Sequence, residues 1–420
     1  MRVLVVGSGG REHALAWKIS RSPLVRALFA APGNPGIARL ATLVPLAATD
    51  VEGLAAWVKA NAVDLVVVGP EAPLVAGLVD RLARDGVPAF GPTAAAAEIE
   101  GSKAFAKDVM RAARIPTAEA ETFEAVAPAL AWARARDGRV VVKADGLAAG
   151  KGVVVCGDVA EAEGALRAML VDRIHGQAGA RVVVEERLEG PEASCIAFTD
   201  GERVRLLAAA QDHKRIFDGD RGPNTGGMGA FSPTPNVTPE VAAMVERDVL
   251  LPAVRELARR GRPFRGALYA GLMLTRRGPR VLEFNARLGD PETQPILLRM
   301  ASDVVPALLA AARGDLSGTA LSFDPRAAVG VVLAAEGYPG EVTRGDAIEG
   351  ADGPFGEDVQ VFHAGTSRAA DGRVVTSGGR VLTVCALGPD LDAAAARAYA
   401  AAARITFRGM QLRKDIGKKP

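Results

Sequence analysis

One stretch of the sequence, residues 140–155, limits the possible folds of this chain more than any other. It reads VVVKADGLAAGKGVVV, in which two runs of valine flank a segment of glycine and small residues. This pattern predicts a β-hairpin with a mobile, glycine-rich tip. Gly146, Gly150 and Gly152 would let the backbone lie against a ligand, and Lys143 and Lys151 offer it positive charge. A chain of phosphates is the natural ligand, although an ordinary hairpin with solvated lysines fits this stretch as well.

Lysine is rare in this chain, with 10 residues against 41 arginines. Lys103, Lys143, Lys151 and Lys214 nevertheless all lie in segments that look functional on other grounds. A compact ammonium group and a planar guanidinium group are not equivalent in recognition. These lysines are therefore predicted to have specific roles.

Composition excludes several classes of protein. The 420 residues are 49% hydrophobic and 24% charged, which is enough for several domains. The net charge is only +2 and the aromatic content 5%, so neither a nucleic-acid partner nor a membrane surface is expected. Three distant cysteines without a C-x-x-C pair predict neither a disulfide framework nor a zinc site. The cytoplasm is the expected location.

The N-terminus predicts an anion site. A strand at residues 2–6 runs into the turn GSGGREH at residues 7–13, and a helix is expected over 14–19. Glu12 stands where the dinucleotide fingerprint needs glycine, and no acidic residue follows the second strand. A single phosphate therefore fits better than NAD. His13 is interpreted as a packing or capping residue rather than a catalytic base.

Four strands are expected in the first hundred residues, separated by amphipathic helices. This alternation predicts a doubly wound parallel sheet, with ligands at the carboxyl ends of its strands. Glu71, after the third strand, suits a substrate contact or a turn cap about equally. The strands are predicted at residues 2–6, 29–31, 64–68 and 87–90.

The next part of the chain alternates helices and strands around the hairpin. Helices are predicted over residues 98–110, 123–136 and 159–170, and a strand over 181–185. The acidic residues that follow this strand could meet an adenine edge and ribose hydroxyls. Solvated turn acids are the alternative.

Residues 211–229 are rich in glycine and polar residues and lack an apolar period, which predicts a long functional loop. Asp212, Lys214 and Arg215 lie side by side in it and could hold a zwitterionic or anionic substrate. A charged turn without function is the alternative.

Two strands, at residues 267–275 and 280–284, are predicted to form a second hairpin. Strand alternation places Glu283 and Asn285 on one face, about 7 Å apart. Mg²⁺ in phosphate sites is held by one or two such side chains, phosphate oxygens and water. If the strand continues, Arg287 shares this face and could stabilise a transferring phosphoryl group.

From about residue 327 the chain consists of short strands, glycine turns and an Ala-rich helix over 391–403. We interpret this part as a separate small α+β domain, in which His363 is a structural histidine. Taken together, the parts of the chain suit ATP-dependent activation of a carboxylate, because a carboxylate oxygen leaves poorly until it is phosphorylated.

The motifs of the chain, in their order, resemble those of the phosphoribosylamine–glycine ligase family of the ATP-grasp superfamily. The resemblance implies that ATP phosphorylates glycine and that 5-phosphoribosylamine attacks the acyl phosphate. Glycinamide ribonucleotide, ADP and phosphate would result, as a step of purine biosynthesis. The matching motifs are residues 7–13, 101–103, 143–152, 211–215, 222–229, 283–294 and 413–417.

The resemblance also implies roles for individual residues. Those expected to contact ATP are Lys103, Lys143, Gly150, Lys151, Gly152, Glu185, Leu188 and Glu192. Those expected at the ribose phosphate are Gly9, Gly10, Arg11 and Glu12. Glu283 and Asn285 would hold Mg²⁺, with Mn²⁺ as an alternative, and the reacting centre would be lined by Asp212, Lys214, Arg287 and Asp290.

The implied architecture is α/β and α+β with several domains. It consists of an N-terminal Rossmann-like domain (1–102), an ATP-grasp core (103–326) with a mobile glycine-flap subdomain (124–192), and a C-terminal α+β domain (327–420). Ala286 and Leu288 depart from the family, whose members often carry Cys and Phe there. No fused downstream enzyme is expected after Pro420, and a monomer is expected.

Three other hypotheses remain open. Glu12 argues against a dehydrogenase built on the N-terminal sheet. Another ATP-grasp ligase would use a different acid or amine, and a non-catalytic regulator would bind nucleotide without turnover.

Overall fold

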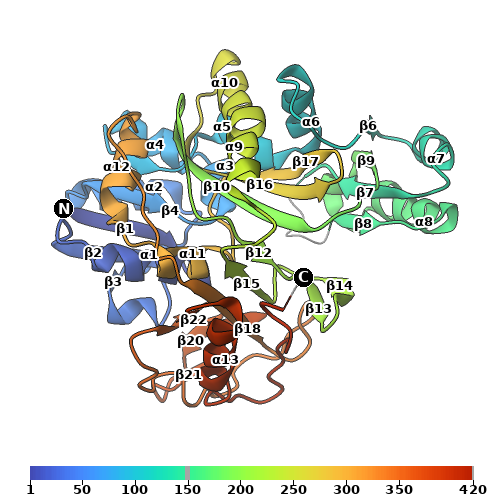
Figure 1. Ribbon diagram of the computed structural model, residues 1–420. Helices are drawn as coiled ribbons and strands as arrows, with labels where there is room; N and C mark the ends of the chain where they lie inside the picture. The colour runs from blue at the N-terminus through green and yellow to red at the C-terminus, as the bar shows by residue number, and fades with distance from the viewer. Residues whose placement is uncertain (147–151, 419–420) are drawn as a thin grey trace.

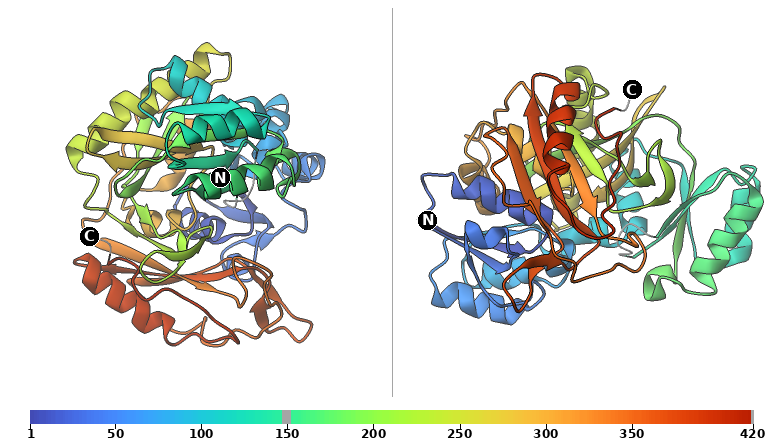
Figure 2. Two further views of the ribbon diagram at one scale, coloured as in Figure 1. Left: turned by 90° about the vertical axis from the view of Figure 1, so that its right-hand side faces the viewer. Right: turned by 90° about the horizontal axis from the view of Figure 1, so that it is seen from below.

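The computed structural model describes residues 1–146 and 152–418 (Figure 1). The tip of the predicted hairpin, residues 147–151, lies outside the described residues, as do residues 419–420. Figures 1 and 2 show a doubly wound N-terminal sheet, a central body, a small subdomain that projects to the right in Figure 1, and a C-terminal sheet below.

The N-terminal sheet is parallel, with strand order β3-β2-β1-β4-β5, which confirms the doubly wound prediction. Alternate residues of β1 enter opposite cores: Leu4 and Val6 pack into one, Val3 and Val5 into the other. The sequence missed β3, whose two residues are exposed. The elements are β1 (Arg2–Gly7), α1 (Gly10–Ser20), β2 (Ala27–Pro32), the 3₁₀ turn η1 (Ile37–Arg39), β3 (Thr42–Leu43), α2 (Val51–Ala60), β4 (Leu65–Val68), α3 (Glu71–Val75), α4 (Leu78–Arg84) and β5 (Ala89–Phe90).

The predicted helix over residues 98–110 is two helices, α5 (Ala94–Gly101) and α6 (Lys103–Ala112). The chain breaks at Ser102, whose backbone is extended and whose hydroxyl accepts a hydrogen bond from the Phe105 amide. Such an N-cap starts a new helix. The break leaves Lys103 at the beginning of α6.

The small subdomain confirms the predicted hairpin, because β7 (Val140–Ala144) pairs antiparallel with β8 (Val153–Val155). Its sheet has the order β6-β9-β7-β8, with β6 (Ala120–Phe123) and β9 (Val182–Glu186). The predicted helix over 123–136 is wrong at its start, because residue 123 belongs to β6. Helices α7 (Val126–Arg134) and α8 (Val159–Leu170) and the turn η2 (Gly176–Gly179) complete the subdomain.

The central body is an antiparallel sheet of order β11-β10-β16-β17, covered by helices. The hairpin of β16 and β17 was predicted, although its turn is shorter than expected. The elements are β10 (Glu192–Asp200), β11 (Val204–Leu206), α9 (Pro239–Val245), the π-helical turn η3 (Glu246–Leu250), α10 (Leu251–Arg259), β16 (Arg265–Thr275), β17 (Gly278–Asn285), α11 (Thr293–Arg299) and α12 (Val304–Arg313).

The C-terminal sheet has the order β12-β15-β18-β22-β19, and α13 packs on it. One of its strands, β12, and the first residue of another, β15, come from the segment predicted as a long loop, which also forms the hairpin β13–β14. That loop prediction was therefore wrong, and the C-terminal sheet is not built from residues after 327 alone. The elements are β12 (Gln211–Asp212), β13 (Arg215–Phe217), β14 (Arg221–Asn224), β15 (Gly229–Ser232), β18 (Ala327–Ala334), β19 (Val359–His363), β20 (Thr366–Arg368), β21 (Val374–Thr376), β22 (Arg380–Gly388) and α13 (Leu391–Ala402).

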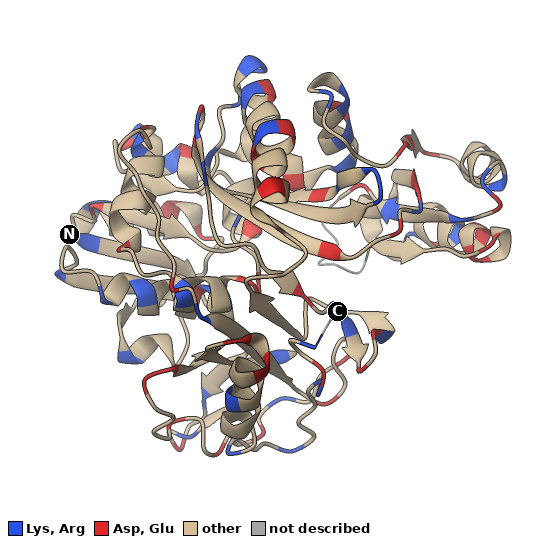
Figure 3. Cartoon of the chain, in the orientation of Figure 1, with Lys and Arg blue, Asp and Glu red and all other residues tan. Residues whose placement is uncertain are grey.

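Basic and acidic residues are interspersed over the molecule in the view of Figure 3. No helix in the described ranges is both long enough and apolar enough to cross a membrane. The three cysteines are buried, and within the described part of the chain they are free thiols.

Candidate active site

Two lysines share one buried carboxylate at the base of the hairpin. Glu185 Oε1 on β9 lies 3.0 Å from Lys143 Nζ on β7 and 3.2 Å from Lys107 Nζ on α6. These side chains are at most 7% exposed. Buried charge needs compensation, so the surplus positive charge of this group suits an anionic ligand.

Lys143 also connects the small subdomain to the central body. Its ammonium group donates a hydrogen bond to the Leu282 carbonyl on β17, 2.8 Å away. Leu282 directly precedes Glu283, so the hairpin lysine and the predicted metal ligand lie at one site.

Lys103, at the start of α6, belongs to the same group. Burial lowers its pKa; the Glu283 carboxylate opposes the shift, and the Lys143 ammonium adds to it. Burial likewise lowers the pKa of Lys107 to about 8, against the opposing effect of Glu185. Burial and nearby like charges together favour the neutral form of these lysines. The negative oxygens of a bound phosphate would favour the charged form again.

Glu283 and Asn285 are partly exposed near the end of β17, two positions apart on one strand face. The Asn285 side-chain oxygen lies 3.4 Å from Arg287 Nη2. No group of three or more His, Cys, Asp or Glu side chains suited to a metal occurs among the described residues. One carboxylate and one amide oxygen fit Mg²⁺ when phosphates and water supply the other ligands.

A second lysine centre lies on the segment after β12. Lys214 Nζ is 2.6 Å from Glu192 Oε2 and 2.9 Å from Asp212 Oδ1. Although burial favours the neutral amine, the Asp212 and Glu192 carboxylates raise the pKa of Lys214 well above its usual value. The ammonium group therefore stays charged.

Three residues that the sequence reasoning did not select stand behind this centre. Glu292 Oε1 accepts hydrogen bonds from the Tyr269 hydroxyl at 2.9 Å and the Ser194 hydroxyl at 3.0 Å. Burial and the Asp212 carboxylate raise the pKa of Glu292, with Lys214 opposing. Glu292 lies in a motif that carries the family resemblance, but Ser194 and Tyr269 look like ordinary strand residues in the sequence.

Arg287 does not continue the face of β17, because the strand ends at Asn285. Its guanidinium group turns to the N-terminal domain, where Nη2 lies 3.0 Å from Glu100 Oε1 and Nε 3.4 Å from Glu71 Oε2. Burial favours the neutral form of Arg287, but the Glu100 and Glu71 carboxylates raise the pKa of its guanidinium group above the usual value. The condition for a shared face, a strand that continues past Asn285, is therefore not met, and Glu71 is an ion-pair partner of Arg287.

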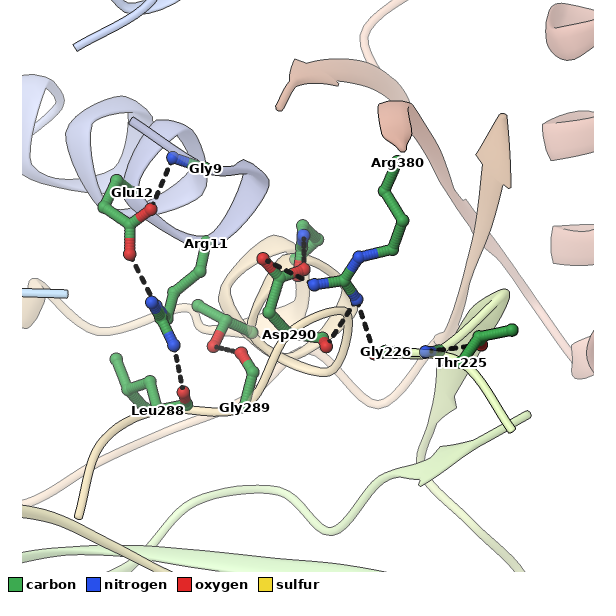
Figure 4. A network of polar contacts seen from close by, with 12 residues as sticks. Gly9, Arg11, Glu12, Thr225, Gly226, Leu288, Gly289, Asp290 and Arg380 are labelled. Carbon is green, nitrogen blue, oxygen red and sulfur yellow. Dashed lines mark hydrogen bonds and ion pairs between the residues drawn. The ribbon is translucent and has the colours of Figure 1, made fainter. Parts of the chain in front are cut away.

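The glycine turn before α1 already contains an anion, which is the carboxylate of Glu12 (Figure 4). The Gly9 amide donates to Glu12 Oε2 at 2.5 Å, and Arg11 Nε to Glu12 Oε1 at 2.6 Å. A Cβ atom at Gly69 would lie 2.1 Å from this carboxylate. The Gly9 amide is thus engaged, whereas the first amides of a helix such as α1, those of Gly10 and Arg11, have no partner within it.

Besides Arg11, a second arginine, Arg380, lies near this turn (Figure 4). The sequence reasoning did not select it. Arg380 Nη1, from β22, donates to the carbonyls of Asp290 at 2.7 Å and Gly226 at 2.6 Å. Although burial favours the neutral acid, Arg380 and Arg11 lower the pKa of Asp290. Gln294 donates to Asp290 Oδ1 at 2.9 Å. In the sequence, Arg380 is one of many arginines and carries no signal.

The sequence analysis interpreted two histidines, His13 and His363, as packing or structural residues. His13 is buried, and its Nδ1 accepts a hydrogen bond from the His363 amide at 2.7 Å. The His363 ring lies 3.1 Å from the Thr366 hydroxyl. Both histidines are therefore structural residues at the contact between α1 and β19.

Comparison with protein families accounts for almost the whole chain. Residues 1–100 match the N domain of phosphoribosylglycinamide synthetase, residues 101–293 its ATP-grasp (A) domain and residues 328–419 its C domain. The chain belongs to the phosphoribosylglycinamide synthetase family.

Relatives in this family are similar over their full length. The phosphoribosylamine–glycine ligase of Caulobacter vibrioides is 53% identical over 418 residues, and that of Escherichia coli O157:H7 is 52% identical over 420. Each alignment covers 99% of this chain and 98% of the relative. The crystal structure of phosphoribosylamine–glycine ligase from Thermotoga maritima is 33% identical, with a TM-score of 0.85 over 99% of this chain and 100% of that one.

The fold extends beyond the family. The biotin carboxylase domain of 2-oxoglutarate carboxylase from Hydrogenobacter thermophilus, solved with MgADP, has a TM-score of 0.76 at 17% identity, over 98% of this chain and 91% of that one. Membership of the phosphoribosylglycinamide synthetase family makes the chain an ATP-binding ligase with the ATP-grasp fold. It contradicts the dehydrogenase hypothesis.

Most residues that the family resemblance selected lie in the lysine groups around Glu185 and Lys214 or at the glycine turn before α1. Gly152 closes the hairpin, because its carbonyl accepts from the Ala144 amide at 2.8 Å. Leu188 is half-buried just after β9. Gly150 and Lys151 lie outside the described residues.

Proposed function

We propose that this protein joins glycine to 5-phosphoribosylamine at the expense of ATP, through a glycyl phosphate, and forms glycinamide ribonucleotide for purine biosynthesis. The observation that carries the proposal is the hydrogen bond from Lys143 to Leu282. It brings the phosphate-binding lysines and the metal-binding strand end to one place, as in-line phosphoryl transfer requires.

The nucleotide site consists of the buried lysines and the acidic end of β9. Lys103 and Lys143, with the hairpin residues Gly150, Lys151 and Gly152, hold the phosphates. Glu185 and Leu188 contact the adenine, and Glu192 the ribose. Glu283 and Asn285 hold Mg²⁺, or Mn²⁺, which when bound neutralises charge on the transferring phosphoryl group.

The chemistry runs in two steps. A carboxylate oxygen of glycine bonds to the γ-phosphorus as the bond to ADP breaks, and the amine nitrogen then bonds to the carbonyl carbon as phosphate leaves. The cationic groups of Lys214 and Arg287 stabilise the negative charge that develops. Asp212 and Asp290 line the reacting centre with them.

We assign the ribose phosphate to the start of α1. Glu12 engages the Gly9 amide, so the amides of Gly10 and Arg11 and the helix dipole supply the anion contacts. Gly9 and Glu12 then shape the turn. For such an enzyme we also propose a monomer that acts in the cytoplasm, which sedimentation and cell fractionation would test.

ADP release tests the proposed function. We expect release that requires glycine and 5-phosphoribosylamine together, with only slow release when either is omitted. Turnover with a different acid or amine, and none with this pair, would favour another ATP-grasp ligase. ATP binding without ADP release under any condition would favour a regulator.

The variant Lys143→Ala tests the observation that carries the proposal. We expect kcat/KM to fall by about 100-fold or more, because the variant loses the phosphate contact and the link to β17. Circular dichroism should be unchanged. Lys59→Ala, at an exposed position on α2, is the control. Near-normal activity of Lys143→Ala would contradict the assigned role.

A further inference from the structure

The C-terminal motif Arg413–Gly417 has no role in the reaction as described so far, yet it contains one of the most buried charged side chains of the chain. Arg413 is 1% exposed. Its guanidinium group donates to Asp415 Oδ1 at 2.7 Å and Oδ2 at 2.6 Å, and to Asp220 Oδ1 at 2.7 Å. A buried guanidinium group with a two-pronged carboxylate contact holds its surroundings in one geometry.

The motif is hydrogen-bonded to the hairpin β13–β14, which lies some two hundred residues earlier in the chain. Arg413 Nη1 donates to the Arg215 carbonyl at 3.1 Å. The Gly219 amide donates to Asp415 Oδ2 at 2.9 Å, and the Lys414 amide to Asp218 Oδ1 at 2.8 Å. Both the start and the turn of the hairpin are thus fixed by residues of the C-terminal motif.

The motif also contacts His213, which lies between Asp212 and Lys214 in the chain. The Gly417 amide donates to His213 Nε2 at 3.3 Å, and His213 is fully buried. Its backbone is held as well, because its amide donates to Gly229 and its carbonyl accepts from Met228. Alternation along an extended segment points Asp212 and Lys214 to one side and His213 to the other.

We propose that Arg413–Gly417, which we call the C-terminal clasp, is a positioning element for Asp212 and Lys214. None of its residues is among the nucleotide or substrate contacts proposed above. It holds the His213 ring and the following hairpin from behind, so that the Lys214 ammonium stays between Asp212 and Glu192. This inference rests on the proposed function in so far as Lys214 acts at the reacting centre.

A positioning role and a purely stabilising role predict different kinetics. Apart from Glu192, which pairs with Lys214, the proposed nucleotide contacts lie on or beside α6, β7, β9 and β17, and no contact of the clasp within the described residues reaches these elements. Loss of positioning should therefore lower kcat and leave the KM for ATP nearly unchanged. Loss of stability alone would lower the Tm and the amount of folded enzyme but not the kcat of what remains folded.

The variant Arg413→Lys tests the clasp, because lysine keeps the charge but loses the planar contact with Asp415. We expect kcat to fall about tenfold or more, the KM for ATP to stay within about twofold, and the ratio of ADP to ligated product to rise. The matched control is Arg326→Lys. Arg326 also pairs with two carboxylates, Asp324 at 2.7 Å and Asp358 at 2.9 Å, but away from the site; its kcat should not change.

Amide hydrogen exchange gives a reading that does not depend on turnover. In Arg413→Lys the amides of Asp212–Lys214 should exchange faster than in the wild type, and in Arg326→Lys they should not. If Arg413→Lys does not fold, Asp220→Asn, which leaves the Arg413–Asp415 contact in place, takes its place in both experiments. Unchanged kcat with unchanged exchange would overturn the proposal. A wild type without activity on both substrates would overturn the proposed function instead, and the exchange result would still decide the clasp.

Discussion

Single lysines carry much of the chemistry that we propose for this site, and the sequence identified most of them. Lys103, Lys143 and Lys214 were selected because lysine is rare and each lies beside a glycine-rich or acidic motif. Lys107 was missed because one lysine in an amphipathic helix looks like a solvated side chain. Only the fold shows that it is buried and that it shares the Glu185 carboxylate with Lys143.

The buried charge of Lys107 predicts a pH-dependent effect on stability. Its pKa in the folded chain is about 8, below the ordinary value of 10.5 for lysine. The unfolded chain therefore binds more protons between these values, so this lysine destabilises the fold below pH 8, and the penalty is relieved as the pH rises from 8 towards 10.5. We expect Lys107→Met to be more stable than the wild type at pH 7, by up to about 3 kcal/mol.

Urea unfolding at several pH values between 7 and 10 measures this difference, which should shrink as the pH rises. Lys59→Met, at an exposed position, should show no such trend. A variant that is less stable than the wild type by the same amount at every pH would mean that the hydrogen bond from Lys107 to Thr117 outweighs the burial of charge.

At the scale of elements, helices and hairpins with local sequence signals were predicted well, whereas pairings between distant strands were not. The hairpin around residue 146 and the helix over 159–170 follow from valine runs, glycines and amphipathic spacing within a few residues. The segment 211–229 lacks such signals, since its strand β12 pairs with β15, which in turn pairs with β18, about a hundred residues later. The site could be predicted in its motifs, but Ser194, Tyr269 and Arg380 enter it only through folding.

The break between α5 and α6 gives a prediction of its own. Ser102 caps α6 and also donates to Asp145 Oδ1 at 3.0 Å, at the foot of the hairpin. Ser102→Ala should cost about 1 kcal/mol of stability and raise the KM for ATP, because Lys103 loses its fixed start of the helix. Thr238→Ala removes a comparable cap from α9, away from the site. Its Tm should fall similarly while its KM stays unchanged; an equal KM for both variants would contradict the link to Lys103.

At the scale of the whole molecule, the C-terminal sheet joins the parts of the chain before and after residue 327. The strand β15 is fully buried and pairs with β18 along its length. A chain cut after residue 326 would expose this edge, which invites association with other chains. We expect residues 1–326 alone to aggregate in size-exclusion chromatography, and co-expression with residues 327–420 to restore a discrete species. A monodisperse fragment 1–326 would show that the edge needs no partner.

The gathering of lysines at the site has a practical consequence for chemical labelling. Outside it, the exposed lysines of the described chain are Lys59, Lys414 and Lys418. An amine-reactive reagent followed by peptide mass mapping would thus meet little background. Protection of Lys103 and Lys214, which are only partly buried, by an added nucleotide or substrate could then be followed one amine at a time, without mutation and without an activity assay.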